Sequence, residues 1–113
     1  MLVMHPESTF IYTVSGDSMD RAGIFDGDRV VVDRSLQPEN GDIVVAVLAG
    51  HAHMVKRLTG RKRESMLEPE SSNPTHKSFQ LRPHEGDVIW GVVTGLVRKV
   101  RKGRRRVDAV SKA

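Results

Sequence analysis

"DIVVAVLAGHAHMVKRL", residues 42–58, is the stretch that decides the fold, because it contains two runs of β-forming residues joined by a short turn. The first run, residues 42–48, is apolar on both faces, which is typical of a strand in the middle of a sheet. A turn over residues 49–51 leads into the second run, residues 52–58, whose side chains alternate between the two faces of a strand. The stretch therefore predicts a β-hairpin with its first strand at the centre of the sheet.

The sequence on either side of this hairpin continues the pattern of short strands separated by turn residues. A short helical turn is expected after Ser18, closed by Gly23. The fold class that follows is mostly β: a single compact domain of curled, mainly antiparallel sheets with that one helical turn. Residues 70–77 read as a polar loop. Further strands are predicted at residues 9–14, 29–33, 65–69, 78–83 and 87–97.

Length and composition narrow the class of protein further. The chain has 113 residues, of which 38% are hydrophobic and 28% charged, as in one globular domain. Cysteine is absent, which excludes disulfides and thiolate metal sites, and no cofactor motif is found. The apolar runs are shorter than the ~20 residues of a transmembrane helix, and residues 1–9 lack the charged start of a signal peptide. We therefore expect a cytoplasmic protein without cofactor or metal that does not enter a membrane.

The net charge of +4 is unevenly distributed along the chain. Residues 97–113 contain eight Lys or Arg residues and one acid, whereas residues 1–96 contain ten bases and thirteen acids. This asymmetry argues against a uniformly basic surface for nucleic acids. We expect residues 1–97 to form the folded domain and residues 98–113 a basic, flexible tail. Such a tail is either simply solvated or adds non-specific, salt-sensitive contacts to DNA phosphates.

Ser18 and Lys56 are the candidate catalytic residues. A serine hydroxyl is a poor nucleophile until a base accepts its proton, and none of the five histidines has a sequence context that marks it as that base. A lysine can serve if burial keeps it neutral. Lys56 shares its predicted strand face with Met54 and Leu58, where an ammonium would be poorly solvated. On the pattern alone, Lys56 also fits a solvated strand lysine, and Ser18 a turn or helix-capping residue.

The order of four short segments favours the catalytic interpretation of Ser18 and Lys56. The segments are "SGDSM" with "GI.DGD.VVVD" (residues 15–33), "GDIVVA" (41–46), "VKRL" (55–58) and "IWGVV" (89–93). With these four segments in this order, the chain resembles the LexA/UmuD group of Ser-Lys peptidases (S24-type). The similarity is nearest to the processed form of UmuD and runs from about His5 to Val97.

The resemblance implies a mostly β fold that forms homodimers, with Ser18 as the nucleophile and Lys56 as its general base. It also implies an oxyanion hole made by the backbone N–H groups of Asp17 and Ser18, which would point at charge that develops only in the transition state. Gly16 and Met19 would shape the turn that exposes the hydroxyl. In this family the reaction hydrolyses one small-residue–Gly bond in the protein's own N-terminal arm, and a RecA–single-stranded-DNA filament promotes it after DNA damage.

The sequence departs from the family pattern at three places. Only 17 residues precede Ser18, so the arm with the scissile bond is absent and self-cleavage in cis is not expected. Ser18 and Lys56 are 38 positions apart, one more than the family pattern, and the additional residue falls at residues 49–54. If the turn or a bulge absorbs it, Lys56 keeps its face, and otherwise the lysine points to solvent. The third departure is the run of seven bases in residues 98–106.

Three functions are consistent with these features. The leading hypothesis is a UmuD-like protein of the SOS response, whose processed form dimerises and assists error-prone translesion synthesis by a Y-family DNA polymerase. The first alternative is the C-terminal dimerisation and self-cleavage domain of a LexA-type transcriptional repressor. The second is a catalytically silent binding module on the same scaffold.

Overall fold

The computed structural model describes residues 7–50, 53–99 and 108–111. Within these ranges the regular structure is mostly β-sheet with three short 3-10 helices, so the predicted fold class is confirmed. No helix of the described ranges is long and apolar enough to cross a membrane. The strands are β1 (Thr9–Thr13), β2 (Arg29–Asp33), β3 (Ile43–Val47), β4 (His53–Thr59), β5 (Met66–Glu68), β6 (Phe79–Gln80), β7 (Val88–Lys99) and β8 (Asp108–Ser111). The 3-10 helices are η1 (Asp20–Ala22), η2 (Lys62–Glu64) and η3 (Pro83–Glu85).

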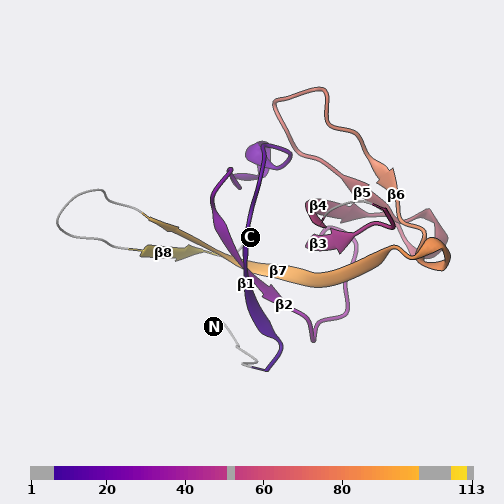
Figure 1. Cartoon of the computed structure of the whole chain (residues 1–113), viewed down its shortest axis with the longest axis horizontal. Coiled ribbons are helices and arrows are strands. Elements are labelled where there is room, and N and C mark those ends of the chain that lie inside the picture. The colour runs from indigo at the N-terminus through magenta and orange to yellow at the C-terminus, as the bar shows by residue number, and fades with distance from the viewer. Residues whose placement is uncertain (1–6, 51–52, 100–107, 112–113) are drawn as a thin grey trace.

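One antiparallel sheet contains all of these strands (Figure 1). Its main path runs β1-β2-β7-β3-β4-β5-β6, and β8 pairs with β7 off this path. β3 lies in the middle of the path, between β7 and β4, as its two apolar faces predicted. The register shifts once where β7 meets β2 and once where it meets β3, and such bulges bend a sheet and increase its twist. The sheet therefore curls around β7, its longest strand.

Each face of the sheet buries its own apolar cluster. The side chains of β3 belong alternately to one cluster and to the other. Ile43 and Val45 belong to one cluster and Val44 and Ala46 to the other, and none of the four is more than 4% exposed. We call the two clusters the first and the second core. The first core contains Val14, Met19, Ile24, Val30, Val32, Ile43, Val45, Val55, Val93 and Leu96. The second core contains Val44, Ala46, Leu48, Leu58, Leu67 and Val92.

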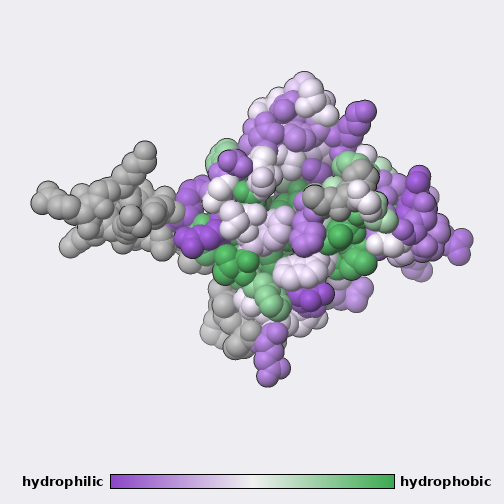
Figure 2. Space-filling view, in the orientation of Figure 1, coloured by the Kyte–Doolittle hydropathy of each residue, from purple (hydrophilic) through white to green (hydrophobic). Residues whose placement is uncertain are grey.

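Some large hydrophobic side chains remain at the surface of the described residues. Figure 2 shows hydrophobic residues gathered in the middle of one face, between hydrophilic ones. A monomer exposes isolated apolar residues without consequence, whereas several together point to an interaction surface. Those exposed are Phe10, Ile11, Phe25, Leu36 and Val88.

The helical turn predicted after Ser18 is confirmed. η1 spans Asp20–Ala22 and ends at Gly23, whose backbone is left-handed with φ 82°. Glycine takes up this conformation without the steric cost that a Cβ would bring. The turn therefore stops after three residues and returns the chain toward β2.

The C-terminal region differs from the prediction. β7 continues past residue 97 to Lys99, and β8, which the sequence analysis did not predict, pairs with residues 96–99 and projects with them from the body (Figure 1). Arg98, assigned above to the tail, donates hydrogen bonds to the Asp28 carboxylate and to the Gly23 carbonyl, the latter at 2.6 Å. The folded part therefore extends beyond residue 97. The rest of the basic run, residues 100–107, lies outside the described residues.

Replacing Gly91 with alanine is expected to destabilise the fold by about 1–3 kcal/mol, the usual cost of overpacking a core. A Cβ at Gly91 would lie 2.4 Å from Val32 Cγ1 and 3.4 Å from the backbone oxygen of Asp33, where β7 packs against β2. Urea denaturation measures the loss. A Gly91→Ala/Val32→Ala double variant is expected to be more stable than the sum of the two single changes predicts, since the clashing methyl is gone. Strict additivity would contradict the proposed clash.

Candidate active site

Contacts of Gly16 and Met19 hold the turn that carries Ser18 on both sides of the serine. The backbone N–H of Gly16 donates to the Asp26 carboxylate at 2.7 Å, and Gly16 is left-handed with φ 88°. Met19 follows Ser18 directly, is 1% exposed and belongs to the first core. Gly16 and Met19 thus hold the turn on either side of Ser18, in the places where the sequence analysis expected them.

Ser18 itself is half-buried and lies against β4. Its Oγ donates a long hydrogen bond of 3.4 Å to the backbone carbonyl of Val55. Val55 is followed by Lys56, so the structure brings the candidate nucleophile to the residue next to the candidate base, across a sequence separation of 37 positions. The oxyanion hole expected at the N–H groups of Asp17 and Ser18 stays a prediction.

Lys56 is buried, with 6% of its surface exposed. It lies opposite Val44 in the β3–β4 ladder, and its neighbours along the same face, Met54 and Leu58, pack in the second core. The predicted strand faces are therefore confirmed. Removal from water disfavours the ammonium form, so burial lowers the pKa of Lys56 from the ordinary lysine value. A lysine in this setting is a better proton acceptor at neutral pH than a solvated one.

The additional residue between Ser18 and Lys56 does not disturb the strand. β3 and β4 pair without a register shift from Val47↔His53 to Ile43↔Arg57. The additional residue therefore does not interrupt the β3–β4 ladder. Of the two outcomes considered above, Lys56 keeps its face.

Residues 70–76 cover the Ser18 turn with hydrogen bonds that the sequence analysis missed. Ser71 Oγ donates to the backbone carbonyl of Asp17 at 2.6 Å, and His76 Nε2 lies 2.5 Å from the Asp17 carboxylate. The contact with His76, followed by one with Asn73, holds the pKa of Asp17 below its usual value. A hydrogen bond from Ser72 does the same for the pKa of Asp20. The predicted polar loop is in fact bound to the turn that carries Ser18.

A bidentate ion pair links this segment to β4. Arg57 donates to the Glu70 carboxylate through Nε at 2.8 Å and through its second terminal nitrogen at 2.9 Å. These hydrogen bonds lower the pKa of Glu70 and raise that of Arg57. Paired hydrogen bonds between charged groups are among the stronger and more directional side-chain contacts. The "VKRL" segment therefore supplies both the candidate base and, one residue later, an anchor for the loop.

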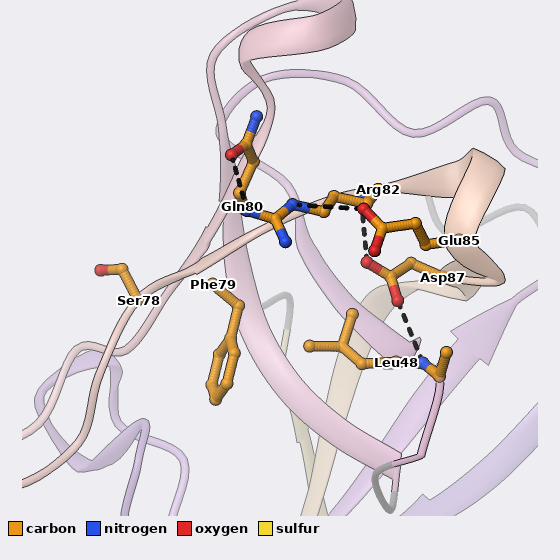
Figure 3. Close-up of a pocket in the computed structure, with 8 residues that line it drawn as sticks. Leu48, Ser78, Phe79, Gln80, Arg82, Glu85 and Asp87 are labelled. Carbon is orange, nitrogen blue, oxygen red and sulfur yellow. Dashed lines mark hydrogen bonds and ion pairs between the residues drawn. The ribbon is translucent and has the colours of Figure 1, made fainter.

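A separate pocket, drawn in Figure 3, has a volume of about 330 Å³ and contains neither Ser18 nor Lys56. The Asp87 carboxylate at its edge accepts hydrogen bonds from the backbone N–H groups of Ala49 and Arg82, at 3.0 and 2.7 Å. Asp87 thus joins the end of β3 to the segment before η3, which is a structural role. In the described part of the chain, no group of three His, Cys, Asp or Glu residues could hold a metal ion.

Comparisons with known proteins agree with this arrangement. Residues 1–94 match the Peptidase S24-like family. The chain is 42% identical to Protein ImpA of Salmonella typhimurium over 90% of its own length and 67% of that protein. It is also 42% identical to Protein MucA of Escherichia coli, over 81% of the chain and 61% of MucA. A LexA repressor, of Staphylococcus carnosus, is 41% identical over 85% of the chain and 44% of its own length. The resemblance found in the sequence is confirmed: the chain belongs to the Peptidase S24-like family.

Proposed function

We propose that this chain is a Ser-Lys peptidase, in which Ser18 is the nucleophile and Lys56 the general base. The observation that carries the proposal is the contact between Ser18 Oγ and the carbonyl of Val55, directly before the buried Lys56. The lowered pKa of Lys56 supports its role, because a larger fraction of its amine is neutral and able to accept a proton. Membership of a peptidase family supports the same chemistry.

The reaction follows from these roles. Ser18 Oγ leaves the Val55 carbonyl and bonds to the carbonyl carbon of the scissile peptide, while its proton passes to the amine of Lys56. The backbone N–H groups of Asp17 and Ser18 stabilise the oxyanion of the tetrahedral intermediate. The Lys56 ammonium then gives the proton to the leaving amine as the C–N bond breaks, which leaves an acyl-serine. Water, deprotonated by Lys56, attacks the acyl carbon and releases the carboxylate product and the Ser18 hydroxyl.

We place this chemistry in an SOS response of the UmuD type. Similarity to ImpA and MucA supports the assignment. In this role the processed form is a homodimer that assists a Y-family translesion polymerase, and a RecA–single-stranded-DNA filament activates the full-length form. The basic residues from 98 onward would add contacts to DNA phosphates.

A second candidate function is the C-terminal domain of a LexA-type repressor. The 41% identity to a LexA repressor favours it, and the chain covers 44% of that relative. Gene neighbourhood distinguishes the two. A Y-family polymerase gene directly downstream supports the UmuD type, whereas an upstream helix-turn-helix segment in the same reading frame supports the repressor.

Wild-type protein is expected to cleave a synthetic peptide of the family's N-terminal arm that contains a small-residue–Gly bond (the arm peptide). Cleavage should be faster at pH about 9–10 than at neutral pH, because more Lys56 is then neutral. Ser18→Ala is expected to lower the rate by about 10³-fold or more, as loss of a nucleophile does in serine peptidases. Mass spectrometry of the products measures the rate.

The control is Ser15→Ala, which removes an exposed hydroxyl from the same turn and should leave the rate unchanged. Equal cleavage by wild type and Ser18→Ala, or cleavage by neither, would rule out the peptidase and favour the silent binding module.

A further inference from the structure

We propose that residues 70–76 form a positioning clasp, which fixes the backbone of the Ser18 turn relative to the strand that carries Lys56. The inference rests on the proposed peptidase and assigns a role to residues that touch neither the substrate nor the transferred proton. It is carried by hydrogen bonds on both sides of Ser18 and by one ion pair to β4.

The first part of the clasp is the backbone of Glu70. Its N–H donates to the carbonyl of Ser18 at 2.9 Å, and its own carbonyl accepts from the N–H of Arg21 at 2.8 Å. One residue therefore binds the turn at two points three positions apart. The peptide group that follows Ser18 cannot rotate without breaking the first of these bonds.

The second part is the hydroxyl of Ser71, which holds the peptide group that precedes Ser18. Ser71 Oγ donates to the carbonyl of Asp17 at 2.6 Å. Because a peptide bond is planar, the carbonyl of Asp17 and the N–H of Ser18 belong to one rigid unit. The bond from Ser71 therefore sets the direction of the Ser18 N–H, one of the two proposed oxyanion donors.

Side chains further along the clasp hold the acids on either side of Ser18. The Asp17 carboxylate is contacted by His76 and, at 3.4 Å, by the amide nitrogen of Asn73. The Asp20 carboxylate accepts from the backbone N–H of Ser72 at 2.8 Å and also from its hydroxyl. These bonds lie at the surface and are individually weak contributors to stability. Together they restrict the turn on both sides of the nucleophile.

The ion pair of Arg57 and Glu70 makes the clasp a link between the two halves of the site. Both side chains are about one-third exposed, at 29% and 35%, and Arg57 also donates to the carbonyl of Gly41 at 2.8 Å. Glu70 is thus bound at its backbone to Ser18 and at its carboxylate to the residue after Lys56. Any motion of the Ser18 turn away from β4 must stretch this connection.

Such a clasp acts on rate rather than on substrate affinity. A misplacement of about 1 Å from the reactive geometry can cost about 10²-fold in rate, even where substrate binding is unchanged. Ser71→Ala and Glu70→Gln are therefore expected to lower kcat for the arm peptide by about 10- to 100-fold with little change in KM. Ser71→Thr keeps the hydroxyl and should restore kcat.

The matched control is Glu64→Gln, which removes the same charge from an exposed residue of η2 and should behave as wild type. A second readout does not depend on activity. Hydrogen exchange of the backbone amides at residues 16–20 is expected to accelerate in Ser71→Ala but not in Ser71→Thr, since only the alanine variant frees the Asp17–Ser18 peptide group.

Two results would overturn the clasp, and they can be told apart. If Ser71→Ala and Glu70→Gln retain wild-type kcat while Ser18→Ala is inactive, the peptidase stands and the clasp is wrong. If wild type cleaves no faster than Ser18→Ala, the peptidase is wrong and the clasp has no reaction to position. Should Glu70→Gln fail to fold, Ser71→Ala decides the question alone, because its hydroxyl belongs to a surface segment.

Discussion

Replacing Lys56 with methionine is expected to abolish cleavage of the arm peptide and, at neutral pH, to make the fold more stable. Without an amine at position 56 nothing accepts the proton of Ser18, and the rate should fall by about 10³- to 10⁴-fold or more. Methionine has a similar length and suits the apolar neighbours Met54 and Leu58 in the second core. It also removes an ionisable group that is only 6% exposed. The free energy of unfolding should rise by about 1–2 kcal/mol, as it does for other substitutions that replace a destabilising functional residue.

The pH dependence of that gain follows from proton linkage. Burial lowers the pKa of Lys56 in the folded protein, whereas in the unfolded chain it returns to about 10.4. Between these two values the unfolded chain binds more protons, so the stability of the wild type rises with pH there. The penalty of Lys56 is therefore full below its folded pKa and disappears above about pH 10.4. Methionine does not titrate, so its advantage should shrink as the pH rises through this window.

Urea denaturation at neutral pH and at pH about 10 measures the stability gain and its decrease with pH. The arm peptide assay measures the loss of activity. Lys77→Met is the control, because Lys77 is exposed and its replacement should give no comparable gain at either pH. A Lys56→Met variant that is less stable than wild type at neutral pH, or equally stabilised at both, would contradict a buried amine with a lowered pKa.

The strands were predictable where turn residues bound an apolar run on both sides. Arg29–Asp33 matches its predicted bounds, and Ile43–Val47 falls within residues 42–48. The second of these was also recognisable as central, because a strand apolar on both faces must be covered on both faces. Short strands such as Asp108–Ser111 are different, since four residues with little apolar character form a strand only when a partner provides the hydrogen bonds. Here β7 provides these hydrogen bonds, and the local sequence pattern does not predict the pairing.

The candidate site was also predictable only where a local sequence pattern marks its residues. Ser18 and Lys56 lie in segments that resemble a family, and alternation along the strand places Lys56 on the apolar face. Residues 70–76 have the composition of a free polar loop, and that composition is the same whether its hydrogen bonds go to water or to protein. Their contacts with Asp17 and Asp20 cross more than 50 positions of sequence. Arg57 and Glu70 are 13 positions apart, and the sequence analysis did not predict their ion pair.

Inserting one alanine between Lys56 and Arg57 is expected to abolish cleavage of the arm peptide. Arg57 and the two residues after it are held by pairing with β5, and Arg57 is also held by Glu70, so this end of β4 keeps its register. The inserted alanine then takes the place opposite Val44, and Lys56 moves to the place of Val55, whose side chain belongs to the first core. A one-residue shift in a strand moves the shifted side chains to the other face, and here these are the residues of β4 that precede the insertion. The amine is thereby moved from the face that it shares with Met54 and Leu58 to the face of the first core, away from its wild-type position.

A variant of the same length separates this effect from a general loss of folding. Lys56→Val combined with insertion of a lysine, rather than alanine, before Arg57 again places a lysine opposite Val44 and a valine in the first core. The lengthening then falls in the connection between Val47 and His53, where one more residue costs only a few tenths of a kcal/mol. We expect this variant to recover most of the wild-type rate, with a circular dichroism spectrum like that of wild type. Activity in the alanine insertion, or none in the folded lysine insertion, would mean that the face of β4 on which the lysine lies does not determine catalysis.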